Sequence, residues 1–156
     1  MKSSSYRYVL LAAGVLVTTF TPSCQKYEEG PLLSFRSPEK RVTNEWTVVY
    51  AEDLDKAENI TEQFDEVNYS IRISKNDSFQ LTYNAPVRRS GLQQRKVNGT
   101  WEFVDDAKKI RWEFQGYDPY RFLSNKGETT LILKLRKDEL WMQNQANDLE
   151  LHLKPL

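Results

Sequence analysis

Few residues in this chain have side chains suited to covalent or acid–base chemistry. The 156 residues include one cysteine, Cys24, and one histidine, His152. A nucleophilic side chain needs an oriented base beside it, but His152 alternates with Leu151 and Leu153, which places it on the polar face of a strand. One cysteine can form neither an internal disulfide nor a thiolate metal cluster. We therefore expect no catalytic residues, no metal site and no cofactor, and a protein that is not an enzyme.

The candidate binding residues lie in two stretches that lack alternation. Arg88 and Arg89 belong to a basic stretch, residues 86–98, that we expect to be a long connection. Their forked guanidinium groups suit carboxylates and sulfates. Tyr117 and Tyr120 belong to a second irregular stretch, and their rings suit stacking on a sugar or packing on a partner. Both stretches also fit a plainer interpretation, a solvated basic loop and aromatic residues that cover one end of the fold.

The chain from Trp46 onward alternates apolar and polar residues, which is the signal of half-buried strands. Eight such runs follow one another, largely joined by short turns: residues 46–50, 69–73, 79–83, 101–103, 110–114, 131–135, 140–142 and 149–153. Closing a sheet of this kind removes its exposed edges. The sequence therefore predicts an all-β fold, a small eight-stranded up-and-down barrel, with a two-sheet sandwich as the alternative.

Bulky aromatic residues are available to fill such a barrel. A barrel of eight strands has room for its own side chains or for one small ligand. Four or more large rings, each burying roughly 150–250 Å², would fill the centre and argue against a large cavity. The candidates are Trp46, Tyr50, Phe79, Tyr83, Trp101, Phe103, Trp112 and Phe114. The acidic residues 52–66 form a longer connection with room for a short helix across one barrel end.

The N-terminus has the organisation of a secretory signal. A basic stretch precedes an apolar run over residues 9–20, which is too short to cross a bilayer. The sequence Thr21-Pro22-Ser23-Cys24 that follows resembles a bacterial lipobox. This resemblance implies that residues 1–23 are removed and that Cys24 carries a diacylglyceryl group on its thiol and an acyl chain on its amino group. At about 0.8 kcal/mol for each buried CH₂, several chains hold a protein stably on a membrane.

The residues after Cys24 indicate to which membrane the protein is sent. Gln25 gives no sign of inner-membrane retention, and the QKYEE sequence of residues 25–29 resembles the export signal of Bacteroidetes surface lipoproteins. We expect an outer-membrane protein, lipid-anchored and exposed at the cell surface, with the periplasmic leaflet as the alternative. Residues 24–43 would form a lipidated tether spanning about 25 Å if flexible, and residues 44–156 the barrel domain.

The charge balance limits the partners. The chain has 22 basic and 22 acidic residues, and only Lys2 and Arg7 of these precede Cys24, so the mature chain has a formal charge of −2. This near balance gives no reason to expect nucleic acid as a partner.

Several short motifs resemble those of lipocalin-like lipoproteins of the Bacteroidetes group. They are the YEEGP of residues 27–31, Asn59-Ile60-Thr61, the hairpin from Tyr69 to Tyr83, Gly99-Thr100-Trp101, and the closing segment from Leu133 to Trp141. The resemblance covers nearly the whole mature chain. It implies a lipocalin-like barrel and assigns no ligand.

Two functions remain open from the sequence. The first is binding of a small hydrophobic ligand or glycan at one barrel end, through Arg88, Arg89, Tyr117 and Tyr120. The second is a structural or accessory role, in which the same loops dock on a larger envelope protein complex. An open cavity would favour the first, and a filled barrel with an exposed docking surface would favour the second.

Overall fold

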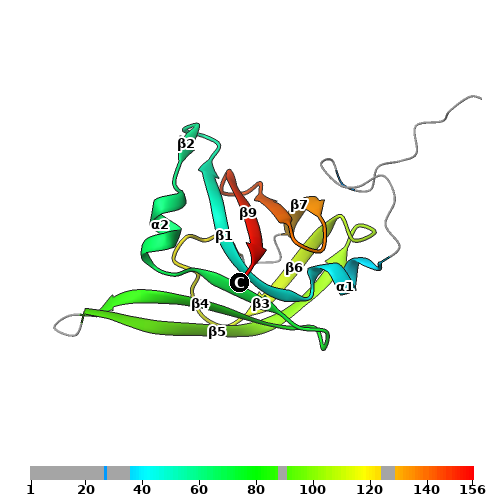
Figure 1. Ribbon diagram of the computed structural model, residues 1–156, viewed down its shortest axis with the longest axis horizontal. Coiled ribbons are helices and arrows are strands. Elements are labelled where there is room, and N and C mark those ends of the chain that lie inside the picture. The colour runs from blue at the N-terminus through cyan, green and yellow to red at the C-terminus, as the bar shows by residue number, and fades with distance from the viewer. Residues whose placement is uncertain (1–26, 28–35, 88–90, 124–128) are drawn as a thin grey trace, which may run out of the picture.

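The protein is a closed antiparallel β-barrel (Figure 1). The structure is a computed structural model that describes residue 27 and residues 36–87, 91–123 and 129–156. Its strands pair in the order β1-β3-β4-β5-β6-β7-β8-β9, and β9 pairs back onto β1. The prediction of an all-β, eight-stranded up-and-down barrel is confirmed, and the sandwich alternative is wrong.

The alternating runs lie on the barrel strands, apart from Tyr69, which directly precedes its strand. Within the described residues the barrel strands are β1 (Asn44–Asp53), β3 (Ser70–Ile73), β4 (Ser78–Val87), β5 (Gly91–Val104), β6 (Lys109–Phe114), β7 (Thr129–Leu135), β8 (Leu140–Asn144) and β9 (Leu149–Pro155). A two-residue strand, β2 (Glu58–Asn59), pairs with the end of β1.

Apolar side chains from every barrel strand fill the interior. Four of the eight expected aromatic residues are buried: Trp46, Phe79, Trp101 and Trp112. The ring of Phe79 packs edge-on against that of Trp112, with 5.0 Å between ring centroids. The expectation that large rings occupy the barrel centre is confirmed.

Two β-bulges change which residues face outward. The register of β1 shifts between Val48 and Tyr50, and the register of β7 shifts between Ile132 and Lys134. An extra residue in one strand moves the following side chains to the opposite face. Tyr50, expected inside, therefore lies on the outer wall, where it pairs with His152 of β9.

Two short helices cover the barrel. In α1 (Pro38–Val42) the Val42 side chain is fully buried, and its carbonyl accepts a hydrogen bond from the indole Nε1 of Trp46 at 2.7 Å. These residues, which the sequence assigns to the tether, thus pack on the barrel. The second helix, α2 (Thr61–Glu66), lies in the acidic connection and buries Phe64. No helix among the described residues is long and apolar enough to span a bilayer.

The β4–β5 hairpin is longer than expected. The prediction that residues 86–98 form a connection is wrong for the described part, because β4 continues to Val87 and β5 begins at Gly91. The two strands pair from Ser78 opposite Thr100 to Val87 opposite Gly91. Figure 1 shows this hairpin extending well past the barrel, away from α1. We call its outer part, residues 84–87 and 91–96, the β4–β5 arm.

Candidate functional site

The candidate ligand-binding residues do not share one environment. Arg88, Arg89 and the lipid-attachment residue Cys24 lie outside the described residues. The Tyr117 side chain is 58% exposed in the loop after β6. Tyr120 is half-buried instead, and its hydroxyl donates a hydrogen bond to the carbonyl of Gln63 in α2.

Tyr120 belongs to an aromatic cluster that closes one barrel end. Its ring stacks on Phe64 of α2, with 4.1 Å between centroids. Tyr69 meets Phe64 edge-on at 5.1 Å and Tyr120 at 5.8 Å. Such contacts stabilise a fold by about 0.5–1.5 kcal/mol beyond their buried area. The ring of Tyr120 therefore holds the loop onto α2, as the plainer interpretation of these aromatic residues expects.

A buried carboxylate, Asp118, organises the same loop. Its oxygens accept hydrogen bonds from the hydroxyl of Tyr69 at 2.9 Å and from the backbone amides of Tyr120 at 3.0 Å and Leu123 at 2.7 Å. The local sequence favours this turn, since Asp and Pro suit its first two positions, and the Arg121 amide closes it onto the Asp118 carbonyl. Burial raises the pKa of Asp118, although these hydrogen bonds oppose the shift.

The base of the β4–β5 arm is fixed by two hydrogen bonds. The hydroxyl of Tyr83 donates to the carbonyl of Tyr117 at 3.3 Å, and the amide of Asn84 donates to the carbonyl of Val67, just after α2, at 2.6 Å. The closed barrel end and the arm therefore form one connected region, with the exposed ring of Tyr117 beside them.

Beyond this base the arm is open to solvent. Residues 91–96 are all exposed, and Leu92 is 60% exposed. In the described part of the chain these residues pair with β4 alone, because β6 pairs with β5 only from Gly99 onward. Their outer backbone groups form a free strand edge. The sequence of the arm and of the three residues between its strands, residues 84–96, is also basic, with four Arg or Lys residues and no Asp or Glu.

A groove of about 430 Å³ lies on the barrel near α1. Half of its lining residues are acidic and two are aromatic; the lining residues are Glu39, Asp77, Thr100, Trp101, Glu102, Phe103, Arg111 and Glu113. Arg111 pairs with Glu102, and Phe103 meets Trp101 edge-on at 5.1 Å. The groove can accept hydrogen bonds from a bound molecule, and it borders the barrel core at Trp101.

The only histidine, His152, is part of a row of side chains on the outer wall. Its ring lies parallel to that of Trp141, with 3.9 Å between centroids, and 4.8 Å from the ring of Tyr50. The ammonium of Lys134 on β7 lies 3.9 Å from the ring centroid of Trp141 on β8. Within β9, His152 Nε2 lies 2.6 Å from Glu150 Oε1. His152 thus lies on the polar face of β9, as predicted, and its ring joins neighbouring strands.

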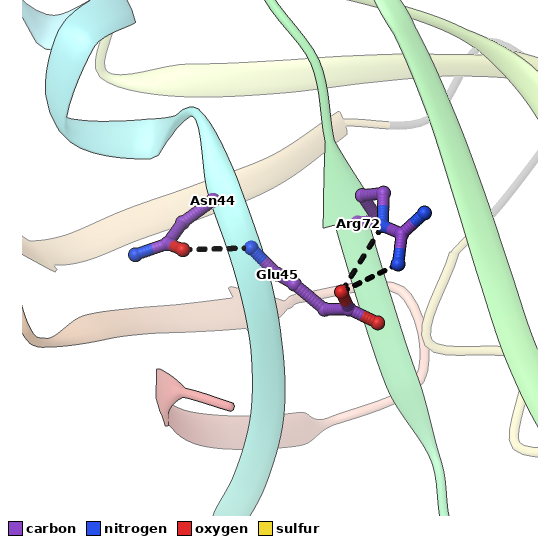
Figure 2. A network of polar contacts seen from close by, with 3 residues as sticks. All are labelled: Asn44, Glu45 and Arg72. Carbon is purple, nitrogen blue, oxygen red and sulfur yellow. Dashed lines mark hydrogen bonds and ion pairs between the residues drawn. The ribbon is translucent and has the colours of Figure 1, made fainter.

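Ion pairs on the wall likewise join neighbouring strands. Figure 2 shows the guanidinium of Arg72 on β3 donating to one carboxylate oxygen of Glu45 on β1, at 2.6 Å and 3.1 Å. In the same view the Glu45 amide donates to Asn44 Oδ1 at 2.9 Å. Such exposed pairs contribute at most about 1 kcal/mol, so we assign them to the wall and not to a binding site.

Tyr27 is buried against the barrel although it lies only three residues from Cys24. It is 3% exposed, and its ring centroid is 5.6 Å from the guanidinium carbon of Arg41. Arg41 in turn donates from Nη1 to the carbonyl of Leu135 at 2.6 Å. Burial raises the pKa of Tyr27 to about 12.

Sequence reasoning missed Asp118 and the exposed strand edge. The Asp118-Pro119 pair signals a turn, but nothing in the sequence indicates that its carboxylate is buried. The run of residues 79–101 without an acidic residue was the available signal for the arm.

Comparisons with known proteins give one distant structural likeness. No family model matches the chain, and no curated protein matches it. The crystal structure of a DUF4847 family protein from Bacteroides vulgatus ATCC 8482 is similar over 73% of this chain and 93% of that chain, at 12% identity and a TM-score of 0.47. At that distance the architecture rests on this chain's own strand pairing.

Proposed function

We propose that this protein is a non-enzymatic, lipid-anchored outer-membrane lipoprotein that docks on a second envelope protein through the β4–β5 arm. The observation that carries the proposal is the free edge of β5, where residues 91–96 are all exposed and, within the described chain, paired only with β4. Natural proteins usually shorten or cover such edges because another chain can pair with them.

The filled interior favours docking over binding of a ligand inside the barrel. Apolar side chains from all the barrel strands meet in one core cluster, and α2 with the loop of Tyr120 closes one end. Ligand-binding barrels instead keep a lined cavity.

The chemistry of the edge indicates the kind of partner segment. An extended segment adds to a free edge by main-chain hydrogen bonds, and side-chain pockets or charges give specificity. Arg95 and Lys96 are exposed on the edge strand, and Arg88 and Arg89 lie close to it in sequence. We therefore propose that the partner presents an extended segment with acidic side chains. Leu92, exposed on the same strand, would add an apolar contact.

The anchor is the lipid on Cys24, and its test is the mass of the mature protein. We expect cleavage before Cys24 and added mass from acyl chains, and a Cys24→Ala variant that keeps its N-terminal segment and gains no acyl mass. An unmodified, uncleaved wild-type protein would contradict the anchor. Protease treatment of whole cells would test surface exposure, and full protection in intact cells would favour the periplasmic leaflet.

The docking proposal is tested by site-specific cross-linking in intact cells. A photoreactive residue at Gln93 is expected to cross-link to one envelope protein with an acidic extended segment, identified by mass spectrometry. The double substitution Arg95→Glu and Lys96→Glu should reduce this cross-link by at least about tenfold, because it places like charges across the contact. The matched control reverses two exposed lysines outside the arm, Lys75→Glu and Lys137→Glu, and should leave the cross-link unchanged.

Two results would refute docking through the arm. One is a Gln93 probe that cross-links to no envelope protein while a probe at another exposed site does. The other is a cross-link that survives charge reversal at Arg95 and Lys96 as well as it survives the control.

The acidic groove favours a second candidate function, binding of a glycan at the barrel surface. Asp77 and Glu113 line it, and carboxylates can accept hydrogen bonds from sugar hydroxyls. Native mass spectrometry of the purified protein would reveal a co-purified sugar. We expect Glu113→Gln and Asp77→Asn to weaken such binding, and a sugar retained equally by both variants would exclude the groove.

A further inference from the structure

The position of Tyr27 limits how far the barrel can lie from the lipid. Tyr27 is 3% exposed, and its ring packs beside Arg41 of α1. Tyr27 is the third residue after Cys24, and a fully extended chain advances at most about 3.6 Å per residue. The Cα atom of Tyr27 therefore lies within about 11 Å of the Cα atom of Cys24, whatever path the chain takes between them.

The attachment of Tyr27 is to the folded barrel and not to a loose segment. Arg41 belongs to α1 and donates a hydrogen bond to the carbonyl of Leu135 at the end of β7. Val42, the next residue, is fully buried in the core. The lipid is therefore separated from the barrel by the short link between Cys24 and Tyr27, and not by a tether of about 25 Å over residues 24–43.

The arm lies at the opposite end of the molecule. Strand β5 runs from Gly91 at the arm to Val104 at the other end, and strands rise about 3.3 Å per residue, so its ends are about 43 Å apart. In Figure 1 the β4–β5 arm lies at the left of the barrel and α1 lies at its right.

From these distances we infer that the α1 end of the barrel is held close to the membrane surface and that the β4–β5 arm points away from it. This inference rests on the proposed lipid anchor at Cys24. It also extends the proposed function, because the partner would then bind the arm on the side of the barrel that faces away from the bilayer. A long tether would allow every face of the barrel to turn toward the membrane, whereas a three-residue link fixes which face is near.

The test measures how near two labelled sites lie to the bilayer. Acylation uses the only cysteine thiol, so a cysteine introduced into the mature protein can be labelled alone. Lys40→Cys places a fluorophore on α1, and Gln93→Cys places one on the arm, both at exposed positions. The acylated, full mature protein is inserted into phosphatidylethanolamine–phosphatidylglycerol vesicles that contain lipids carrying an acceptor dye on the headgroup.

We expect energy transfer to the lipid dye to be at least about twofold greater from the Lys40→Cys label than from the Gln93→Cys label, since about 40 Å of strand separates the two ends. Equal transfer, or greater transfer from the arm, would overturn the inference. Mass spectrometry of the same samples separates the two proposals. Protein without acyl chains overturns the anchor and the orientation together, whereas acylated protein with equal transfer overturns only the orientation.

A spacer variant tests whether the short link is the cause. Twelve Gly and Ser residues inserted between Gln25 and Lys26 leave Tyr27 in place and add a coil of about 20 Å. We expect the difference in transfer between the two labels to shrink toward zero. A difference that persists at full size would show that another contact orients the barrel and would overturn the role of Tyr27.

Discussion

The buried carboxylate of Asp118 should contribute substantially to the stability of the closed barrel end. Replacing it by alanine leaves the hydroxyl of Tyr69 and the amide of Leu123 buried without an acceptor. Each such group costs about 1–3 kcal/mol. The cost of burying a carboxylate, which raises the pKa of Asp118, offsets part of that sum. We expect Asp118→Ala to lower the free energy of unfolding by about 2–4 kcal/mol.

The pKa shift adds a pH dependence with a defined sign. Because the pKa of Asp118 is raised in the folded state, the folded protein holds this proton more tightly than the unfolded chain does. Its contribution to stability is fully present below the ordinary pKa of aspartate and is lost as the pH rises through the folded pKa. The difference in stability between wild type and Asp118→Ala should therefore be largest in acid and should narrow as the pH rises from about 4.

Urea unfolding of the purified protein between pH 4 and 8, followed by tryptophan fluorescence, measures both effects. The matched control is Asp138→Ala, since Asp138 is an exposed turn residue, and it should change stability by no more than about 0.5 kcal/mol. If Asp118→Ala were no more destabilising than this control, or if its effect grew with pH, the assigned role of Asp118 would be wrong.

Three further substitutions test other parts of the barrel by the same unfolding assay. Gly99→Ala should destabilise the fold by about 3 kcal/mol or prevent folding, because a Cβ there would lie 2.3 Å from the carbonyl oxygen of Glu113. Such a clash with the backbone cannot relax by a side-chain movement. A stability close to that of the wild type would refute the close approach. Trp141→Ala should cost about 2 kcal/mol by removing the stack on His152, and a change below about 0.5 kcal/mol would show that this row does not join the strands. Arg41→Ala should cost about 1.5–3 kcal/mol through loss of a buried charged hydrogen bond, and an unchanged stability would contradict the docking of α1.

Most of the strands could be predicted because their buried residues alternate with more exposed ones. The alternation of Leu149, Leu151 and Leu153, for example, survives in β9 as buried positions separated by outward ones. Eight such segments without long crossovers leave a closed meander as the simplest way to remove strand edges.

The arm could not be predicted by the same rule. Residues 91–96 are exposed on both faces, so neither face requires apolar side chains. Apolar and polar residues therefore need not alternate there, and the sequence of such a strand resembles that of a polar loop. The bulges in β1 and β7 could not be predicted either. A bulge is a shift in the pairing between two strands, so the sequence of one strand alone does not indicate it.

The contacts of Asp118 and Tyr27 were beyond sequence reasoning because they join distant parts of the chain. Asp118 meets Tyr69 across 49 residues, and Tyr27 rests on a helix of five residues that is too short to be stable without the barrel. Tertiary packing decides both, so local propensity gives no signal for either.

Amide hydrogen exchange at the arm tests the central claim most directly. In the free protein, the amides of residues 91–96 that point away from β4 should exchange rapidly, while those bonded to β4 exchange slowly. After the cross-linking partner is purified and added, we expect the fast amides to become protected, because a strand added to the edge would bond to them. Protection confined to the acidic groove or to Tyr117, with the fast amides of residues 91–96 unchanged, would contradict the claim that the arm is the docking element.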